Sequence, residues 1–139
     1  MKIAVSGCLL GENCKYNGGN NYNAKLAAFL EGHEVISICP ETLGGLPTPR
    51  KPAEIVAGVV MREDGISVDE EFRKGAQSAL EIVRKEGAEL VILQSRSPSC
   101  GVHAIYDGTF SKKIIPGEGV FAALLRAHGI PVLDVADLK

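Results

Sequence analysis

Short apolar runs rich in β-branched residues alternate along this chain with segments whose apolar residues recur at helical spacing. The apolar runs at 2–6, Val35–Cys39, Leu90–Leu93 and Val132–Val135 predict buried strands. Strands that alternate with helices in this way are typical of βαβ units, which build a mostly parallel sheet. We therefore expect an α/β fold of the Rossmann-like, doubly wound type, with residues 1–139 forming a single domain.

Three segments have the periodicity of amphipathic helices. These segments are Ala24–Glu31, the stretch from Ser67 to Gly87, and Glu118–His128. In the first, the spacing of Leu26, Phe29 and Leu30 places them on one buried face. Ser67 and Glu70 match a capping box, which predicts that the second helix begins there.

The remaining segments predict loops and short strands. The stretch from Pro40 to Pro52 is rich in proline and glycine and is predicted to lack regular structure. Glu63–Gly65 predicts a hairpin turn between strands at Val59–Arg62 and Ile66–Val68. Ala104–Phe110 predicts a short strand near the edge of the sheet. Loops as long as the one from residue 40 to 52 are usually functional or disordered in small domains.

Composition limits the classes of function. The chain has 139 residues and a formal net charge of −2, with its lysines and arginines spread along the sequence, so nucleic acid is an unlikely partner. No apolar run approaches the ~20 residues that cross a bilayer, and the start lacks the features of a signal peptide. We therefore expect a cytoplasmic protein with a small-molecule ligand and no membrane association. Its oligomeric state is not predicted.

Three of the four cysteines stand just after predicted strands. Cys8, Cys39 and Cys100 each lie beside glycine, proline or serine, and the carboxyl ends of parallel strands meet at one edge of a sheet. We therefore expect the three thiols to converge. In a reducing compartment such thiols bind metal or take part in catalysis more often than they form disulfides. The alternative for each thiol taken alone is a small buried residue without chemistry.

The number of thiols indicates which metal centre they would hold. A structural zinc site takes four ligands, and none of the spacings is a C-x-x-C pair. Three thiolates from separate loops suit an iron–sulfur cluster with one iron left open to substrate. Such an iron would act as a Lewis acid.

Several motifs carry a family resemblance that spans nearly the whole chain. The runs are SGCLLGENCKYNGG, ICPETLGGLPTPRKPAEIV, SRSPSCG, IYDGTF and GEGV, in this order. The chain resembles the small bacterial and archaeal domain family that includes the 2-thiouracil desulfidases. The resemblance implies a [4Fe–4S] cluster held by Cys8, Cys39 and Cys100, with Cys14 outside the ligand set. We expect Cys14 to be a loop thiol without a chemical role; the alternatives are a fourth ligand in the resting state or a sulfur acceptor. It also implies non-redox removal of sulfur from 2-thiouracil, 4-thiouracil or thiouridine, which gives the carbonyl product and hydrogen sulfide.

Hydrolysis of a thiocarbonyl needs groups that move protons. Glu41 lies two residues after Cys39, so it would share the loop of a cluster ligand. Ser97 is the second candidate and Ser99 its close rival; the resemblance implies a glutamate and a serine of SPSC as the catalytic pair. The sequence alone leaves the choice between the two serines open. Lys15 and Arg50 are candidates to offset the negative charge of a cluster.

Two other classes of function stay open at this point. A non-catalytic sulfur carrier or an iron–sulfur redox sensor would use the same thiols, and a zinc-bound binding module would use them as metal ligands. The natural substrate is not predicted beyond a thiolated pyrimidine.

Overall fold

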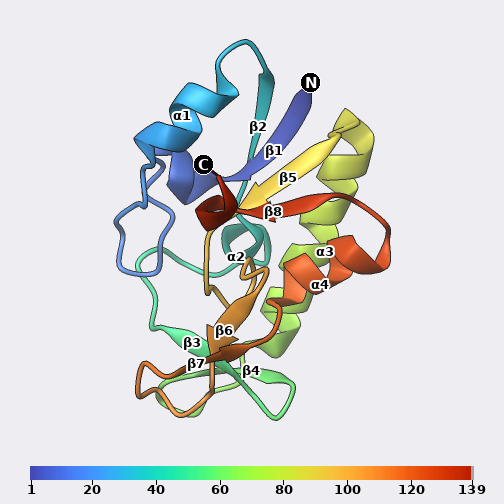
Figure 1. The fold of residues 1–139 in the computed structure, drawn as a ribbon. Helices are drawn as coiled ribbons and strands as arrows, with labels where there is room; N and C mark the ends of the chain where they lie inside the picture. Colours follow the sequence, from blue (N-terminus) through green and yellow to red (C-terminus); the bar gives the residue numbers. More distant parts are fainter. Residues whose placement is uncertain (139) are drawn as a thin grey trace.

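A four-stranded parallel sheet forms the centre of the protein (Figure 1). The computed structural model describes residues 1–138. The strands are β1 (Lys2–Ser6), β2 (Glu34–Ile38), β5 (Leu90–Leu93) and β8 (Val132–Asp134), in the spatial order β2-β1-β5-β8. In β1, Ile3 lies opposite Val35 of β2 and Leu90 of β5. The parallel α/β sheet predicted from the apolar runs is confirmed.

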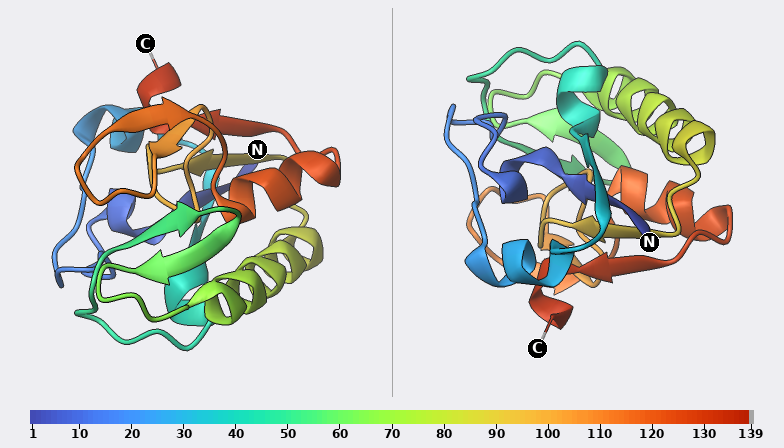
Figure 2. Two further views of the ribbon diagram at one scale, coloured as in Figure 1. Left: turned by 90° about the horizontal axis from the view of Figure 1, so that it is seen from below. Right: turned by 90° about the horizontal axis from the view of Figure 1, so that it is seen from above.

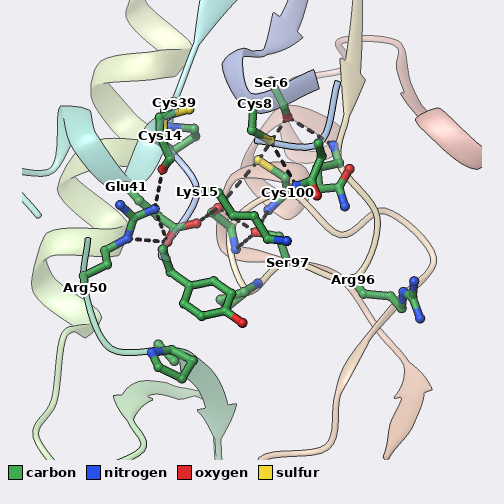
Figure 3. Close-up of a pocket in the computed structure, with 18 of the residues that line it drawn as sticks. Ser6, Cys8, Cys14, Lys15, Cys39, Glu41, Arg50, Arg96, Ser97 and Cys100 are labelled. Carbon is green, nitrogen blue, oxygen red and sulfur yellow. Dashed lines mark hydrogen bonds and ion pairs between the residues drawn. The ribbon is translucent and has the colours of Figure 1, made fainter. Parts of the chain in front are cut away.

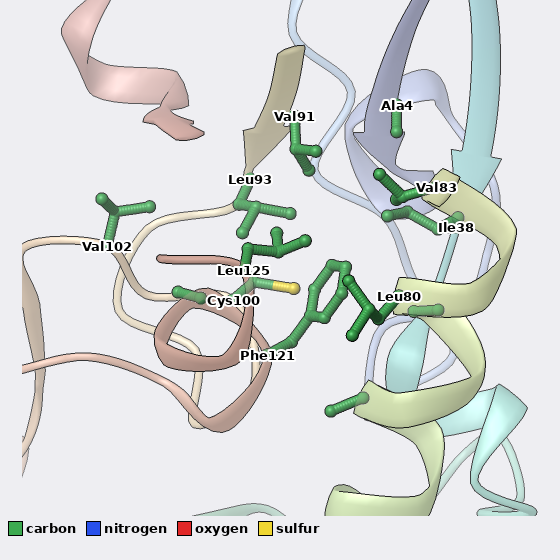
Figure 4. Packing of buried hydrophobic residues seen from close by; sticks show 13 residues of the cluster. Ala4, Ile38, Leu80, Val83, Val91, Leu93, Cys100, Val102, Phe121 and Leu125 are labelled. Carbon is green, nitrogen blue, oxygen red and sulfur yellow. The ribbon is translucent and has the colours of Figure 1, made fainter. Parts of the chain in front are cut away.

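Helices cover both faces of the sheet (Figure 2). They are α1 (Ala24–Leu30) on one face and α3 (Asp69–Glu86) with α4 (Val120–Ala127) on the other. Leu26 and Leu30 of α1 pack on Ile3 and Val5 of β1, because alternate side chains of a strand point to opposite faces. The second face holds the larger core, which contains Phe121, Leu80 and Leu125 together with the Cys100 side chain (Figure 4).

The order of the strands reverses direction next to β1. The chain passes from β1 through α1 to β2 on one side, and then returns to place β5 on the other side of β1. In open α/β sheets, ligands bind beside the carboxyl ends of the strands at such a switch point. The loops that follow β1 and β5, which carry Cys8 and Cys100, therefore lie at the position where this fold places ligands.

Two hairpins lie beyond the carboxyl ends of the parallel strands (Figure 1). They are formed by β3 (Ala53–Val56) with β4 (Val59–Arg62), and by β6 (Ala104–Tyr106) with β7 (Ile114–Pro116). The hairpin predicted around Glu63–Gly65 is partly formed: Met61 and Ser67 make an antiparallel bridge, and the N–H groups of Arg62 and Val68 donate to the carbonyl oxygens of Ile66 and Val60 at 2.8 and 2.9 Å. Residues 66–68 do not form a strand, however, and the main partner of β4 is β3. The strand that pairs with β4 precedes it, across a turn in which Ala57 and Gly58 both have positive φ.

A short helix, α2 (Pro40–Leu43), lies in the stretch predicted to be irregular. Proline is well suited to the first turn of a helix because its missing N–H would be unpaired there. Tertiary contact explains why so short a helix forms: α2 crosses α3 at Gly44 and Gly75, where the two backbones touch. A Cβ added at Gly75 would lie 1.7 Å from the carbonyl oxygen of Pro40. The lack of side chains at both glycines permits this approach.

Several finer predictions also need correction. Phe29 is 42% exposed, whereas Leu26 and Leu30 are buried as predicted. The capping box is absent: Val68 is the N-cap of α3 and makes no side-chain cap bond. Three acidic residues in the first turn of α3 instead complement the positive end of the helix dipole.

None of the helices within residues 1–138 has the length and apolar character needed to span a membrane.

Candidate functional site

One cavity of about 510 Å³ opens at the carboxyl ends of β1, β2 and β5. Cys8, Cys39 and Cys100, which follow these three strands, all line it (Figure 3). The short 3₁₀ helix η1 (Gly7–Leu10) carries Cys8, and the N-cap of α2 is Cys39. Other residues of the cavity wall include Cys14, Lys15, Tyr16, Glu41, Arg50, Glu54, Arg96, Ser97, Ser99, Tyr106, Phe110 and Lys112. The structure thus brings together every cysteine, glutamate and serine that the sequence selected.

The segment that carries Cys100 is held by the start of α4. The Val120 N–H donates to the carbonyl oxygen of Pro98 at 2.8 Å, and the Phe121 N–H donates to that of Ser99 at 2.9 Å. A Cβ added at Gly119 would lie 2.5 Å from the carbonyl carbon of Ser99. The loop after β5 therefore takes its shape from a helix that comes later in the chain.

Two of the predicted ligand thiols accept hydrogen bonds. Cys100 Sγ accepts from the hydroxyl of Ser6 at 3.4 Å and lies 3.5 Å from Ser99 Oγ, and Cys8 Sγ accepts from the Asn21 amide at 3.5 Å. Burial raises the pKa of Cys100 to about 12, and burial also raises the pKa of Cys8. The free thiols are therefore protonated at neutral pH. Metal binding would release these protons, because the thiolate is the ligand.

The fourth thiol, Cys14, also lies at the cavity, beside Cys39 (Figure 3). Burial, and then the neighbouring Cys39 thiol, raise the pKa of Cys14 to about 12. Cys14 follows no predicted strand, so the sequence pattern does not place it at the cavity. The loop from residue 11 to 23 folds back over the edge of the cavity and brings it there.

The spacing and the type of the metal-binding side chains determine which metal centre the cavity can hold. Within residues 1–138, no three His, Cys, Asp or Glu side chains lie close enough together to hold a single metal ion. The three predicted ligands instead line a cavity of about 510 Å³. They are soft thiols, the ligand type that iron–sulfur clusters prefer. The residues present therefore fit a cluster.

Glu41 lies in the first turn of α2 and is bound at both carboxylate oxygens. Oε1 pairs with Arg50, at 3.0 Å from Nη2 and 3.1 Å from Nε, while Oε2 accepts a hydrogen bond from Ser99 Oγ at 2.8 Å. The side chains of Arg50 and Glu41 are only 8% and 17% exposed. The carboxylate is therefore fixed in one orientation.

Arg50 connects three segments of the wall. Besides Glu41, its guanidinium donates to the carbonyl oxygens of Cys14 at 2.9 Å and Pro47 at 3.2 Å, and to Thr48 Oγ1 at 3.0 Å. We expected Arg50 to offset the charge of a cluster directly. The structure shows that its charge is paired with Glu41 instead. Lys15 lines the cavity with its Nζ 5.9 Å from the ring centre of Tyr16.

The two serines form a hydrogen-bonded chain that leads to Glu41. Ser97 Oγ lies 2.9 Å from Ser99 Oγ and accepts the N–H groups of Ser99 and Cys100, each at 3.1 Å. An ionised carboxylate only accepts, so Ser99 donates its proton to Glu41 and its oxygen is free to accept the proton of Ser97. Ser99 is 1% exposed, whereas Ser97 is half-buried and nearer the open space. The hydrogen bonds therefore run in the order Ser97, Ser99, Glu41, and all three residues line the cavity.

This fold and cavity place the chain among small α/β enzymes that present cysteines and a buried carboxylate at the switch point of a parallel sheet. The sequence profile of the 2-thiouracil desulfurase family matches residues 3–137. The chain belongs to this family.

Comparisons with individual proteins agree with this assignment. The solved structure of the [4Fe-4S]-dependent thiouracil desulfidase TudS superposes with a TM-score of 0.91 at 43% identity, over 99% of this chain and 92% of that one. The uncharacterized protein YbbK of Bacillus subtilis (strain 168) is 40% identical over 147 residues, which cover 99% of this chain and 97% of YbbK. The predicted family, the doubly wound fold and the class of enzyme, a thiouracil desulfidase, are confirmed.

Proposed function

We propose that this chain, as a single domain, removes sulfur from a thiolated pyrimidine by hydrolysis at an iron–sulfur cluster. The reaction converts a thiocarbonyl and water into a carbonyl and hydrogen sulfide, and it requires no electron donor. One observation carries the proposal: in a member of the desulfurase family, three thiols and the Ser97–Ser99–Glu41 chain line the same cavity. The proposed setting is the cytoplasm, where such thiols stay reduced.

Cys8, Cys39 and Cys100 would hold a [4Fe–4S] cluster and leave one iron without a protein ligand. That iron would supply a Lewis acid for the soft thiocarbonyl sulfur, in agreement with the [4Fe-4S] dependence stated for TudS. Cys14 is left outside this ligand set.

The hydrogen-bonded chain assigns separate roles to Ser97, Ser99 and Glu41. Ser97 Oγ faces the open space, so it orients the attacking water or accepts its hydrogen bond. As the water gives a proton to Ser97, Ser97 passes its own proton to Ser99, and Ser99 passes its proton to Glu41 Oε2. The protonated Glu41 then returns a proton by the same path to the departing sulfur, which leaves as hydrogen sulfide, and the carboxylate is restored. The N–H groups of Ser99 and Cys100 point at Ser97 Oγ and stabilise negative charge that develops there.

Arg50 keeps Glu41 in the geometry that this transfer needs. Because Arg50 binds Oε1, the other oxygen, Oε2, remains directed at Ser99. Arg50 also holds the Cys14 loop against α2 through its hydrogen bond to the carbonyl oxygen of Cys14.

The proposal is tested by reconstituting the protein with iron and sulfide under anaerobic conditions and incubating it with 2-thiouracil and with 4-thiouridine. We expect release of sulfide and loss of the thiocarbonyl absorbance. Glu41→Gln and Ser97→Ala are expected to keep the iron content and lose at least about 100-fold in kcat, as removal of a proton-transfer group usually does.

Other outcomes would support the alternative functions. Sulfur transfer or redox cycling of the cluster without sulfide release, unchanged in Glu41→Gln and Ser97→Ala, would indicate a sulfur carrier or a redox sensor. Protein that contains about one zinc per chain and negligible iron and sulfide would indicate a zinc-bound binding module. Absence of turnover on every thiolated pyrimidine tested would refute the proposed reaction.

A further inference from the structure

Glu54 is a buried carboxylate that the proposed chemistry does not use. It lies in β3 and is 9% exposed, and its Oε1 accepts the N–H groups of Gly108 at 2.9 Å and Phe110 at 3.2 Å. Burying a charged group is costly unless hydrogen bonds compensate for the lost water, and here both partners are backbone groups of the loop between β6 and β7. Glu54 therefore joins one hairpin to the loop of the other.

The loop that Glu54 binds has an unusual backbone. Phe110 and Lys112 have φ values of 56° and 65°, in the left-handed region that is rare for bulky residues. Such conformations persist where the surroundings hold them, and they concentrate at ligand sites. Gly108 is pressed against β3, because a Cβ there would lie 2.7 Å from the carbonyl oxygen of Ile55. The hairpin contact thus holds this loop in a shape that the sequence would not otherwise adopt.

The held loop forms part of the cavity wall. Tyr106, Phe110 and Lys112 all line the cavity, and Phe110 is half-buried and belongs to none of the hydrophobic core clusters among residues 1–138. Aromatic faces bind flat heteroaromatic rings by stacking, and this contact tolerates changes of substituent. An aromatic ring on a constrained loop is therefore suited to a planar pyrimidine.

We propose that Glu54 is a positioning residue that latches the 107–113 loop, so that Phe110 forms the wall against which the pyrimidine ring of the substrate stacks. This inference rests on the proposed function for the identity of the substrate. It assigns to the two hairpins the task of ring recognition, separate from the thiols and from the Ser97–Glu41 chain.

Steady-state kinetics of the cluster-loaded enzyme test the proposal. Phe110→Leu and Glu54→Ala are expected to raise KM for 2-thiouracil about tenfold or more while kcat and the iron content change little, since base–aromatic stacking has this magnitude. Phe110→Tyr keeps a ring and Glu54→Gln keeps an oxygen that accepts both N–H groups, so both are expected to retain the KM of the wild type. Glu89→Ala is the matched control, because Glu89 accepts the N–H of Lys2 at the other end of the sheet.

Limited trypsin digestion of the cluster-free protein gives a second readout that does not depend on activity. Lys112 and Lys113 are exposed in the loop. Glu54→Ala removes the hydrogen bonds that hold this loop, so trypsin is expected to cleave there at least about fivefold faster than in the wild type. Glu54→Gln and Glu89→Ala are expected to be cleaved at the rate of the wild type. Equal cleavage of all four proteins would overturn the latch. An unchanged KM in Phe110→Leu would overturn the stacking wall.

The two proposals fail in different ways. If the wild type turns over no thiolated pyrimidine, the proposed reaction and the proposed stacking of the pyrimidine on Phe110 are both refuted. The trypsin experiment still shows whether Glu54 holds the 107–113 loop in place. If the wild type is active but the Glu54 and Phe110 variants lose kcat at constant KM, only the present inference is overturned.

Discussion

Replacing Gly75 by alanine tests whether the contact between α2 and α3 positions the site. In an exposed helix interior this change would stabilise the protein by about 0.5–1 kcal/mol, because glycine is a poor helix former. Gly75 is in the middle of α3, but an added Cβ would lie 1.7 Å from the carbonyl oxygen of Pro40 and 2.9 Å from the amide nitrogen of Gly44.

The collision involves backbone atoms, so no side-chain rotation can relieve it. Ordinary contact distances between heavy atoms are about 3.5 Å, and α2 would have to withdraw by roughly 1.5 Å or more. Overpacking of this kind costs about 1–3 kcal/mol and sometimes more. We expect Gly75→Ala to lower the free energy of unfolding by about 2 kcal/mol, against the gain that helix propensity predicts.

Chemical denaturation of the cluster-free protein measures this loss, and sulfide release by the loaded enzyme measures its effect on the site. Because α2 carries Glu41 and directly follows Cys39, a shift of about 1 Å can lower kcat by as much as 100-fold. Gln77→Ala, an exposed change in the same helix, is the control and is expected to stay within about 0.5 kcal/mol of the wild type. A Gly75→Ala protein that is as stable and as active as the wild type would refute the reasoning.

Three further predictions concern the cavity. Arg50→Met is expected to lower the free energy of unfolding by about 3 kcal/mol, because it leaves the largely buried Glu41 carboxylate without its ion pair. Arg73→Met breaks an exposed pair with Asp69 and is expected to cost less than about 1 kcal/mol. Equal losses in urea denaturation would contradict this difference. Ser99→Ala is expected to lower kcat as strongly as Ser97→Ala, at constant iron content, because either change interrupts proton transfer from water to Glu41. Full activity of Ser99→Ala would exclude proton transfer through Ser99. Burial raises the pKa of Cys100 to about 12, so the unfolded chain loses this proton near pH 9 while the folded cluster-free protein keeps it. The stability from this thiol is therefore complete below pH 9 and falls as the pH rises toward 12, and denaturation curves of Cys100→Ala are expected to show a smaller fall over that range.

The sequence was sufficient to predict the sheet and the place of the thiols. Continuous apolar runs such as Leu90–Leu93 are typical of parallel strands buried on both faces, and the rule that ligands bind at the carboxyl ends then brings Cys8, Cys39 and Cys100 together. These features depend on periodicity and on chain order, which can be read from one sequence.

The features that sequence reasoning missed depend on tertiary contact. The helix α2 forms where two glycines let backbones touch, and no local pattern encodes that crossing. Arg50 and Glu41 are nine residues apart, and their pairing depends on the fold of the loop between them. Glu54 could have been noticed as a charge within the apolar run AEIV, but its partners lie more than 50 residues away.

The support that α4 gives to the segment around Cys100 bears on how the protein is made. During synthesis the ribosome releases Cys8 and Cys39 long before residues 119–121 emerge, and until then the loop after β5 lacks the amide donors that shape it. A nascent chain therefore has no complete thiol site. A cluster held by all three thiols can be inserted only once residues 119–121 have emerged and α4 packs on this loop.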